Sequence, residues 1–153
     1  MNASYPLPHR LVFAASAIAI LCTAGAVDAQ TQRARRVAPA DLPSYWILDH
    51  AARDAMVPNS GKNLRVPVCA SVRYTIGSDG AVYDATLAKV EPDSSLGPTA
   101  VEIVKNFHYR AGAENPSQSP VETYYTVQFN MRDLPDSDKD RYMAACDLLG
   151  YAR

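Results

Sequence analysis

Apolar and polar residues alternate along residues 66–76 and 121–131, and each stretch predicts a β-strand. Residues 121–131 form the clearest of the predicted strands. Residues 82–90 are expected to return as the second strand of a hairpin. Between residues 66–76 and 82–90, the run from Gly77 to Gly80 predicts a hairpin turn in which Gly80 takes the left-handed backbone conformation.

Helical spacing of apolar residues predicts three helices. The first begins at Ser44 and places Tyr45, Leu48 and Ala52 on one face. The second begins at Gly97-Pro98 and carries an apolar stripe at Ala100, Ile103, Val104 and Phe107. The third begins at Ser137, lines one side with Tyr142, Cys146 and Leu149, and is capped by Gly150.

The order helix, strand, strand, helix, strand, helix predicts an α+β fold. For this order of elements we expect a three-stranded antiparallel sheet. One face of each strand is polar, so the helices are expected to pack on a single face of that sheet. The predicted architecture is a small two-layer sandwich.

The N-terminus predicts export. Arg10 precedes the apolar stretch of residues 11–21, and Val27-Asp28-Ala29 fits a cleavage site. This pattern divides the chain into a signal peptide (residues 1–29), a short linker (residues 30–41) and a domain with an added C-terminal helix (residues 42–153). Residues 11–27 are also long enough to be retained as a membrane helix, which is the alternative.

Charge gives no indication of an anionic partner. The chain has 15 Lys and Arg against 16 Asp and Glu, for a formal net charge of −1. A balance of this kind argues against nucleic acid or an anionic membrane surface as a general partner. Membrane contact is therefore expected only if the N-terminal segment is not cleaved.

Cysteine usage predicts one disulfide. Cys22 is removed with the signal peptide, and Cys69 and Cys146 remain as a pair. In an exported protein such a pair is expected to be oxidised. The alternative is two buried free thiols.

Catalytic and metal-binding patterns are weak. The exported part contains only His50 and His108, and no cysteine follows either histidine at the short spacing of a zinc site. No phosphate-binding loop or nucleophile elbow occurs. We expect no enzyme activity, no metal and no cofactor, and the alternative is an enzyme or inhibitor that uses a cleft around His108, Tyr109 and Arg110.

Three segments of the chain, taken in order, resemble the C-terminal domain of the TonB family. They are VRYTIGSDGAVYDATL, AVEIVKNFHYRAG and TYYTVQFNM. The resemblance covers roughly residues 42–131. The residues that match the family's motifs are Tyr45, Asp79, Gly80, Phe107 and Tyr109.

This resemblance implies a periplasmic module that binds an extended protein segment, such as one from an outer-membrane receptor, by adding it to the edge of the last strand. The candidate edge residues are Glu122, Tyr124, Thr126, Gln128 and Asn130. Two alternatives stay open: an edge that the C-terminal segment covers, and a short energy transducer anchored in the inner membrane by residues 11–27. The oligomeric state is open as well.

Overall fold

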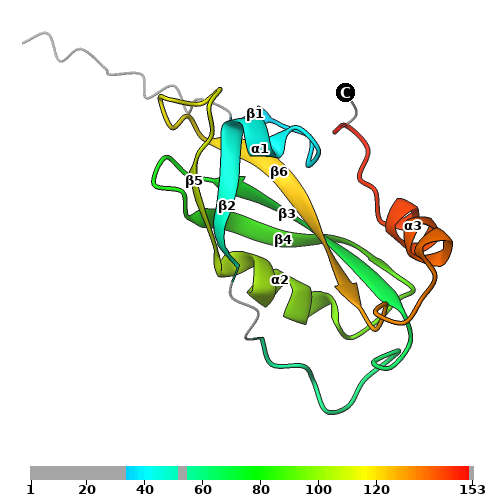
Figure 1. Cartoon of the computed structure of the whole chain (residues 1–153). Coiled ribbons are helices and arrows are strands. Elements are labelled where there is room, and N and C mark those ends of the chain that lie inside the picture. Colours follow the sequence, from blue (N-terminus) through cyan, green and yellow to red (C-terminus); the bar gives the residue numbers. More distant parts are fainter. Residues whose placement is uncertain (1–33, 52–54, 152–153) are drawn as a thin grey trace, which may run out of the picture. The chain divides into compact units, whose positions relative to one another are not determined.

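A four-stranded sheet with the strand order β1-β6-β3-β4 forms the centre of the fold (Figure 1). The computed structural model describes residues 34–51 and 55–151. The strands of this sheet are β1 (Arg35–Arg36), β3 (Val68–Ile76), β4 (Val82–Glu91) and β6 (Val121–Phe129). β3 pairs antiparallel with β4 and β6, whereas β1 pairs parallel with β6. The predicted three antiparallel strands are therefore present, and the short β1 makes the sheet mixed.

A second, two-stranded sheet corrects the prediction for the first helix. α1 (Leu42–Tyr45) is a single turn, and the chain continues as β2 (Trp46–Ala51), antiparallel to β5 (Phe107–Ala111). A strand directs Trp46 and Leu48 to one face, whereas a helix would separate them by more than half a turn. Trp46 is thereby 2% exposed. Tertiary burial of this indole outweighs the local helical pattern.

The helix α2 (Gly97–Lys105) covers one face of the large sheet together with β2 and β5 (Figure 1). Its start at Gly97-Pro98 was predicted, but it ends at Lys105 rather than at Phe107. Phe107 is the first residue of β5, so the helical stripe predicted to include it ends earlier, and His108 also lies in this strand. The main core joins buried residues of α2 to alternate residues of β3, namely Ala70, Val72, Tyr74 and Ile76.

The opposite face of the sheet carries α3 (Asp136–Ala145), so the expectation that all helices pack on one face is wrong. Cys69 points away from the main core, because its neighbours in β3 point into it. It packs instead with Met131 and Cys146. The helix ends one residue before Cys146, so Leu149 is not part of it and is 99% exposed.

A disulfide joins Cys69 to Cys146, as predicted. The two Cα atoms are 6.1 Å apart, and both side chains are fully buried. The bond fixes the end of α3 to β3 and is consistent with an oxidising, exported compartment. The predicted signal peptide and the alternative membrane helix, with Cys22, lie outside the described residues. Within residues 34–51 and 55–151, none of the helices has the length and apolar character needed to cross a membrane.

The hairpin between β3 and β4 confirms the predicted turn. Gly80 has φ of +77°, and its N–H donates to the carbonyl of Gly77 over 3.0 Å. Asp79 accepts hydrogen bonds from the Ala81 N–H at 3.0 Å and the Tyr83 hydroxyl at 2.7 Å. The N–H of Tyr109 in turn donates to the carbonyl of Gly80 over 2.9 Å. The turn therefore joins the large sheet to β5.

Replacing Gly80 with Ala should destabilise the protein by at least about 2 kcal/mol. The positive φ disfavours any side chain, and a Cβ here would overlap the carbonyl oxygen of Tyr109. Urea denaturation measures the change. Ser78→Ala, in the same exposed turn, is the control and should stay within about 0.5 kcal/mol of the parent protein. An equally small effect of Gly80→Ala would contradict the close approach of the turn to β5.

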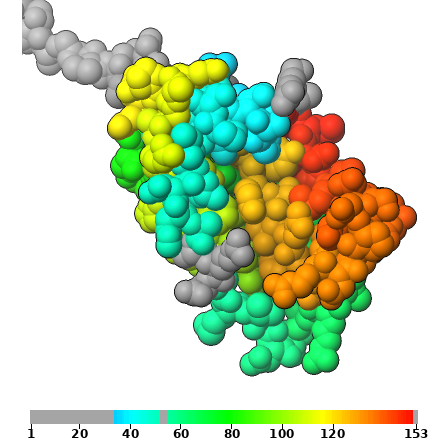
Figure 2. All heavy atoms as spheres, in the orientation of Figure 1, coloured from blue at the N-terminus to red at the C-terminus, as the bar shows by residue number. Residues whose placement is uncertain are grey.

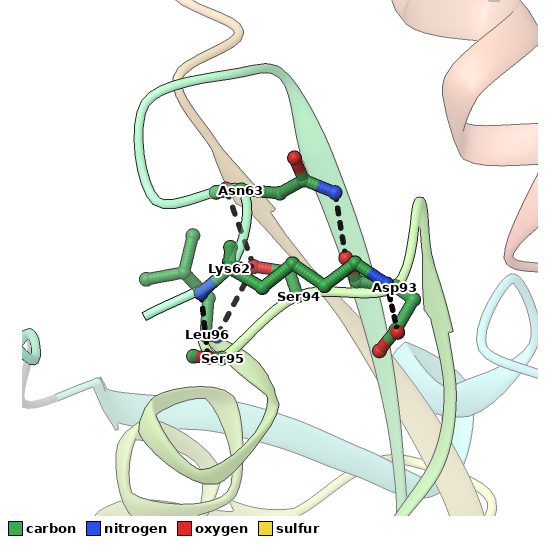
Figure 3. A network of polar contacts seen from close by, with 6 residues as sticks. All are labelled: Lys62, Asn63, Asp93, Ser94, Ser95 and Leu96. Carbon is green, nitrogen blue, oxygen red and sulfur yellow. Dashed lines mark hydrogen bonds and ion pairs between the residues drawn. The ribbon is translucent and has the colours of Figure 1, made fainter. Parts of the chain in front are cut away.

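A polar network anchors the connection from β2 to β3 at the start of α2 (Figure 3). The Ser94 hydroxyl lies 3.2 Å from the Lys62 carbonyl oxygen and accepts a hydrogen bond from the Leu96 N–H. The Asn63 side chain donates to the Asp93 carbonyl over 2.8 Å. These contacts hold the connection against the start of α2.

Candidate functional site

The outer edge of β6 is unpaired over most of its length. On one side β6 pairs with β3 at nine positions, from Val121 to Phe129. On the other side β1 pairs with only Val121 and Glu122, and the last main-chain bond runs from the Val37 N–H to the Glu122 carbonyl over 2.9 Å. Beyond Glu122 no neighbouring strand follows within the described part of the chain.

The direction of that last bond identifies the free main-chain groups. Neighbouring residues of a strand direct their N–H and C=O groups to opposite sides. The main-chain carbonyl of Glu122 points outward, so the main-chain N–H and C=O groups of Tyr124, Thr126 and Gln128 point outward as well. None of these main-chain groups has a main-chain partner among the described residues. We refer to residues 124–128 as the open edge.

The two outer edges of the sheet differ in their protection. On β4, the pairing with β3 shifts register twice, and Asp84, Lys89 and Glu91 place charges along the strand. Bulges and charges of this kind prevent pairing with another chain. In contrast, residues 123–129 carry no charged side chain, and their pairing with β3 is regular. The β4 edge therefore carries protection against pairing that residues 123–129 of β6 lack.

An apolar groove of about 610 Å³ runs beside the open edge on the core side of the sheet. Its walls come from β2, α2, β5 and β6, with Leu48, Ile103, Phe107 and Tyr125 among the lining residues. Tyr125 is 42% exposed, and its ring packs edge-on against Phe107 at 5.1 Å between centroids. Every described residue that lines this apolar groove is uncharged.

A second hollow, of about 460 Å³, lies on the opposite side of the open edge. It is bounded by residues 38–40 and by the C-terminal segment, residues 147–151. Asp147 is the charged residue among its described lining residues, and we call this hollow the acidic groove. Figure 2 shows β6 in the surface between β2 on one side and α3 with the C-terminal segment on the other.

The side of β6 that was predicted to face water is partly covered. Tyr124 is only 9% exposed, because its ring packs against Tyr151 of the C-terminal segment at 5.0 Å between centroids. The Tyr124 hydroxyl also lies 3.4 Å from an Asp147 carboxylate oxygen. The C-terminal segment thus covers a side-chain face of β6 and leaves its main-chain edge unpaired.

Glu122 connects both chain ends of the domain to β6. Its Oε1 accepts hydrogen bonds from Arg36 Nε and from the Tyr151 hydroxyl, each over 2.8 Å. The Arg36 guanidinium lies over the Tyr151 ring, 5.0 Å from its centroid. Partial burial alone would raise the pKa of Glu122, but the hydrogen bonds from Tyr151 and Arg36 outweigh it and lower this pKa. Burial and the bond to Glu122 raise the pKa of Tyr151 to about 12.

Because the pKa of Glu122 is lower in the folded state, its stabilising effect is present above its usual value of 4.5 and is lost as the pH falls further. We therefore expect Glu122→Gln to lower the melting temperature at pH 7, and the difference from the parent protein to shrink between about pH 5 and pH 3. Thermal melts across this range provide the measurement. Glu102→Gln, which removes only an exposed pair with Lys105, is the control. A difference that stays constant with pH would contradict the role of the Glu122 carboxylate.

The predicted edge residues fall on β6 with one exception. Glu122 pairs with β1, and Tyr124, Thr126 and Gln128 form the open edge. Asn130 lies beyond the strand, and its side-chain amide donates to the carbonyls of Leu64 and Val66.

The residues that match the family motifs lie away from the open edge, except for Phe107. Asp79, Gly80 and Tyr109 meet where the hairpin contacts β5, and burial raises the pKa of Tyr109 to about 12. Phe107 lines the apolar groove, and the Tyr45 ring lies beneath the guanidinium of Arg35, 4.7 Å from it. These residues build the scaffold of the site and do not form its open edge.

Histidine placement was not predictable from the sequence spacing. His50 and His108 are direct partners across β2 and β5, and both are exposed. Residues 46–50 are three apolar residues followed by Asp49 and His50, so the sequence contains no alternation that could have revealed this pairing. The described residues nevertheless contain no group of three or more His, Cys, Asp or Glu side chains that could hold a metal ion.

Comparison with known proteins leaves the family open, because no family model and no curated protein matches the chain. The resemblance to the TonB C-terminal domain therefore stays a prediction.

Proposed function

We propose that this protein is a periplasmic protein-binding module that accepts an extended segment of another protein on the open edge of β6, in the manner of TonB C-terminal domains. The observation that carries the proposal is the unpaired, uncharged run of residues 124–128 beside an apolar groove. Main-chain hydrogen bonds to the edge supply affinity in this mode of recognition, and side chains that enter the neighbouring groove supply selectivity.

β4 carries bulges and charges along its outer edge, and residues 123–129 of β6 carry neither. This difference favours a β6 edge that binds a partner over a β6 edge that stays unused. An open, uncharged strand edge promotes aggregation unless something pairs with it, and β4 carries the usual protection. The disulfide and the sequence pattern of the N-terminus support an exported location. A link to outer-membrane transport rests on the family resemblance.

A peptide titration tests the proposal. The ¹⁵N-labelled protein is titrated with a seven-residue peptide in which Thr and Val alternate, so that every register presents one apolar face. We expect the largest amide shifts at Tyr124, Thr126 and Gln128 and smaller shifts along the apolar groove. Shifts confined to β4, or no shift at a millimolar peptide concentration, would overturn strand addition at β6.

A further inference from the structure

Two grooves flank the open edge, and they differ in charge: the carboxylate of Asp147 lines one, whereas the described lining of the other has no charged residue. This difference specifies the partner beyond the proposed function, on which the inference rests. Side chains of a strand point alternately to the two faces of its sheet. A strand added to residues 124–128 would therefore direct every second side chain to the apolar groove. The remaining side chains would point to the acidic groove.

The apolar groove selects uncharged, apolar side chains. Leu48, Ile103 and Phe107 form its wall, and its described lining residues include no charge that could pair with an ionised group. A charged side chain placed there would lose hydration without compensation. Aliphatic or aromatic side chains instead gain burial against these walls.

The acidic groove selects a cation on an apolar stem. Asp147 is exposed, and no Lys, Arg or His of the described chain forms an ion pair with it. Pro39, Leu148 and Leu149 line the same groove. Lys and Arg lay their methylene stems along apolar surface while the charged head stays in water or meets a carboxylate. Among residues 34–51 and 55–151, the carboxylate of Asp147 is therefore available to a cation of a partner, with the Tyr124 hydroxyl as its neighbour at 3.4 Å.

We propose that the occupant is an extended segment of another protein, about five residues long, in which apolar residues alternate with residues that include a Lys or Arg. The apolar side chains enter the apolar groove, and the cation pairs with Asp147. The length follows from the extent of the open edge, which ends at Gln128 and is bounded at Glu122 by β1.

A second copy of this chain fits less well. Antiparallel pairing of two β6 strands centred on Thr126 would place Gln128 of one copy opposite Tyr124 of the other. Residues 123–129 contain no Lys or Arg, so this pairing would bring no cation to Asp147. The charge of the site therefore favours a different protein.

Three seven-residue peptides test the inference on the full protein. In each peptide Val alternates with a second residue, which is Lys, Thr or Glu, and we call them Lys-Val, Thr-Val and Glu-Val. Calorimetry at low salt should give the tightest binding for Lys-Val, about fivefold tighter than Thr-Val, and the weakest for Glu-Val. Asp147→Asn should abolish the preference for Lys-Val over Thr-Val. Glu91→Gln on β4 changes the net charge equally and should keep the preference.

The outcomes separate the two proposals. If Thr-Val binds at β6 as tightly as Lys-Val, strand addition stands and the requirement for a cation is overturned. A preference for Lys-Val that persists in Asp147→Asn overturns the role of Asp147. If none of the peptides binds, both proposals fail. Dimerisation of the peptide-free protein through β6, seen by sedimentation and lost in Thr126→Pro, would identify a second copy as the occupant instead.

Discussion

Thr126→Pro should weaken binding of an alternating peptide by at least about 30-fold. The N–H of Thr126 points out of the sheet at the middle of the open edge. Proline removes this donor and places its ring where the added strand must approach. A lost main-chain bond and an unsatisfied carbonyl on the peptide together cost about 2–4 kcal/mol, and each 1.4 kcal/mol is tenfold in affinity. Calorimetry with the Thr-Val peptide measures the loss.

The fold should tolerate this change, because an edge strand accepts proline where its N–H faces outward. Thr126→Ala is the matched control: it also removes the hydroxyl that bonds to Ser71 at 2.7 Å, but it keeps the N–H. Gln128→Pro is a second variant at another outward position. Normal binding by both proline variants, with unchanged melting temperatures, would contradict recognition at this edge.

Removing the disulfide with Cys69→Ala and Cys146→Ala should lower the free energy of unfolding by about 2–5 kcal/mol. The bond closes a loop with a sequence separation of 77, so it strongly restricts the unfolded chain. α3 itself has no buried residue, and its attachment to the sheet depends on the cluster of Cys69, Met131 and Cys146. Urea denaturation measures the loss. Peptide binding should weaken as well, because the C-terminal segment forms one wall of the acidic groove.

Single substitutions provide the control for the disulfide. Because either change breaks the same bond, Cys69→Ala and Cys146→Ala should each cost nearly as much as the double change. Two small and additive losses would show that the side chains stabilise the protein by packing alone and that the covalent link has little effect.

The elements that were predicted correctly depend on local chemistry. The turn at Gly77 to Gly80 and the three strands β3, β4 and β6 are indicated by neighbouring residues, and the structure confirms them. The start of α2 at Gly97-Pro98 is local in the same way. The disulfide was predictable because residues 30–153 contain two cysteines, which allow one internal pair.

The errors concern elements whose conformation is decided by distant partners. Residues 46–51 have no apolar–polar alternation that would indicate a strand, and pairing with β5, about 60 residues later, selects the strand. β5 was assigned to a helix end and a loop because its five residues are too few for periodicity to be clear. The position of α3 on the second face depends on the side to which Cys69 points. Its short, polar sequence contains little information about that side.

The open edge was only partly predictable. The long alternation of residues 121–131 indicated a strand with an available edge, but not which face the C-terminal segment covers. Tyr124 lies on the face of the strand with Glu122 and Gln128, which the pattern predicts to be polar, and yet it is buried, whereas Tyr125 on the other face is exposed. The two grooves unite residues from β2, α2, β6 and the C-terminus, and sequence spacing contains no signal for such a combination.

Amide hydrogen exchange along β6, with and without the Lys-Val peptide, tests the central claim most directly. In the free protein we expect protection to alternate: slow exchange at Thr123, Tyr125 and Val127, which bond to β3, and fast exchange at Tyr124, Thr126 and Gln128. The peptide should slow the second set. Uniform protection along β6 in the free protein, or fast exchange at the second set that persists at saturating peptide, would contradict an open edge that accepts a strand.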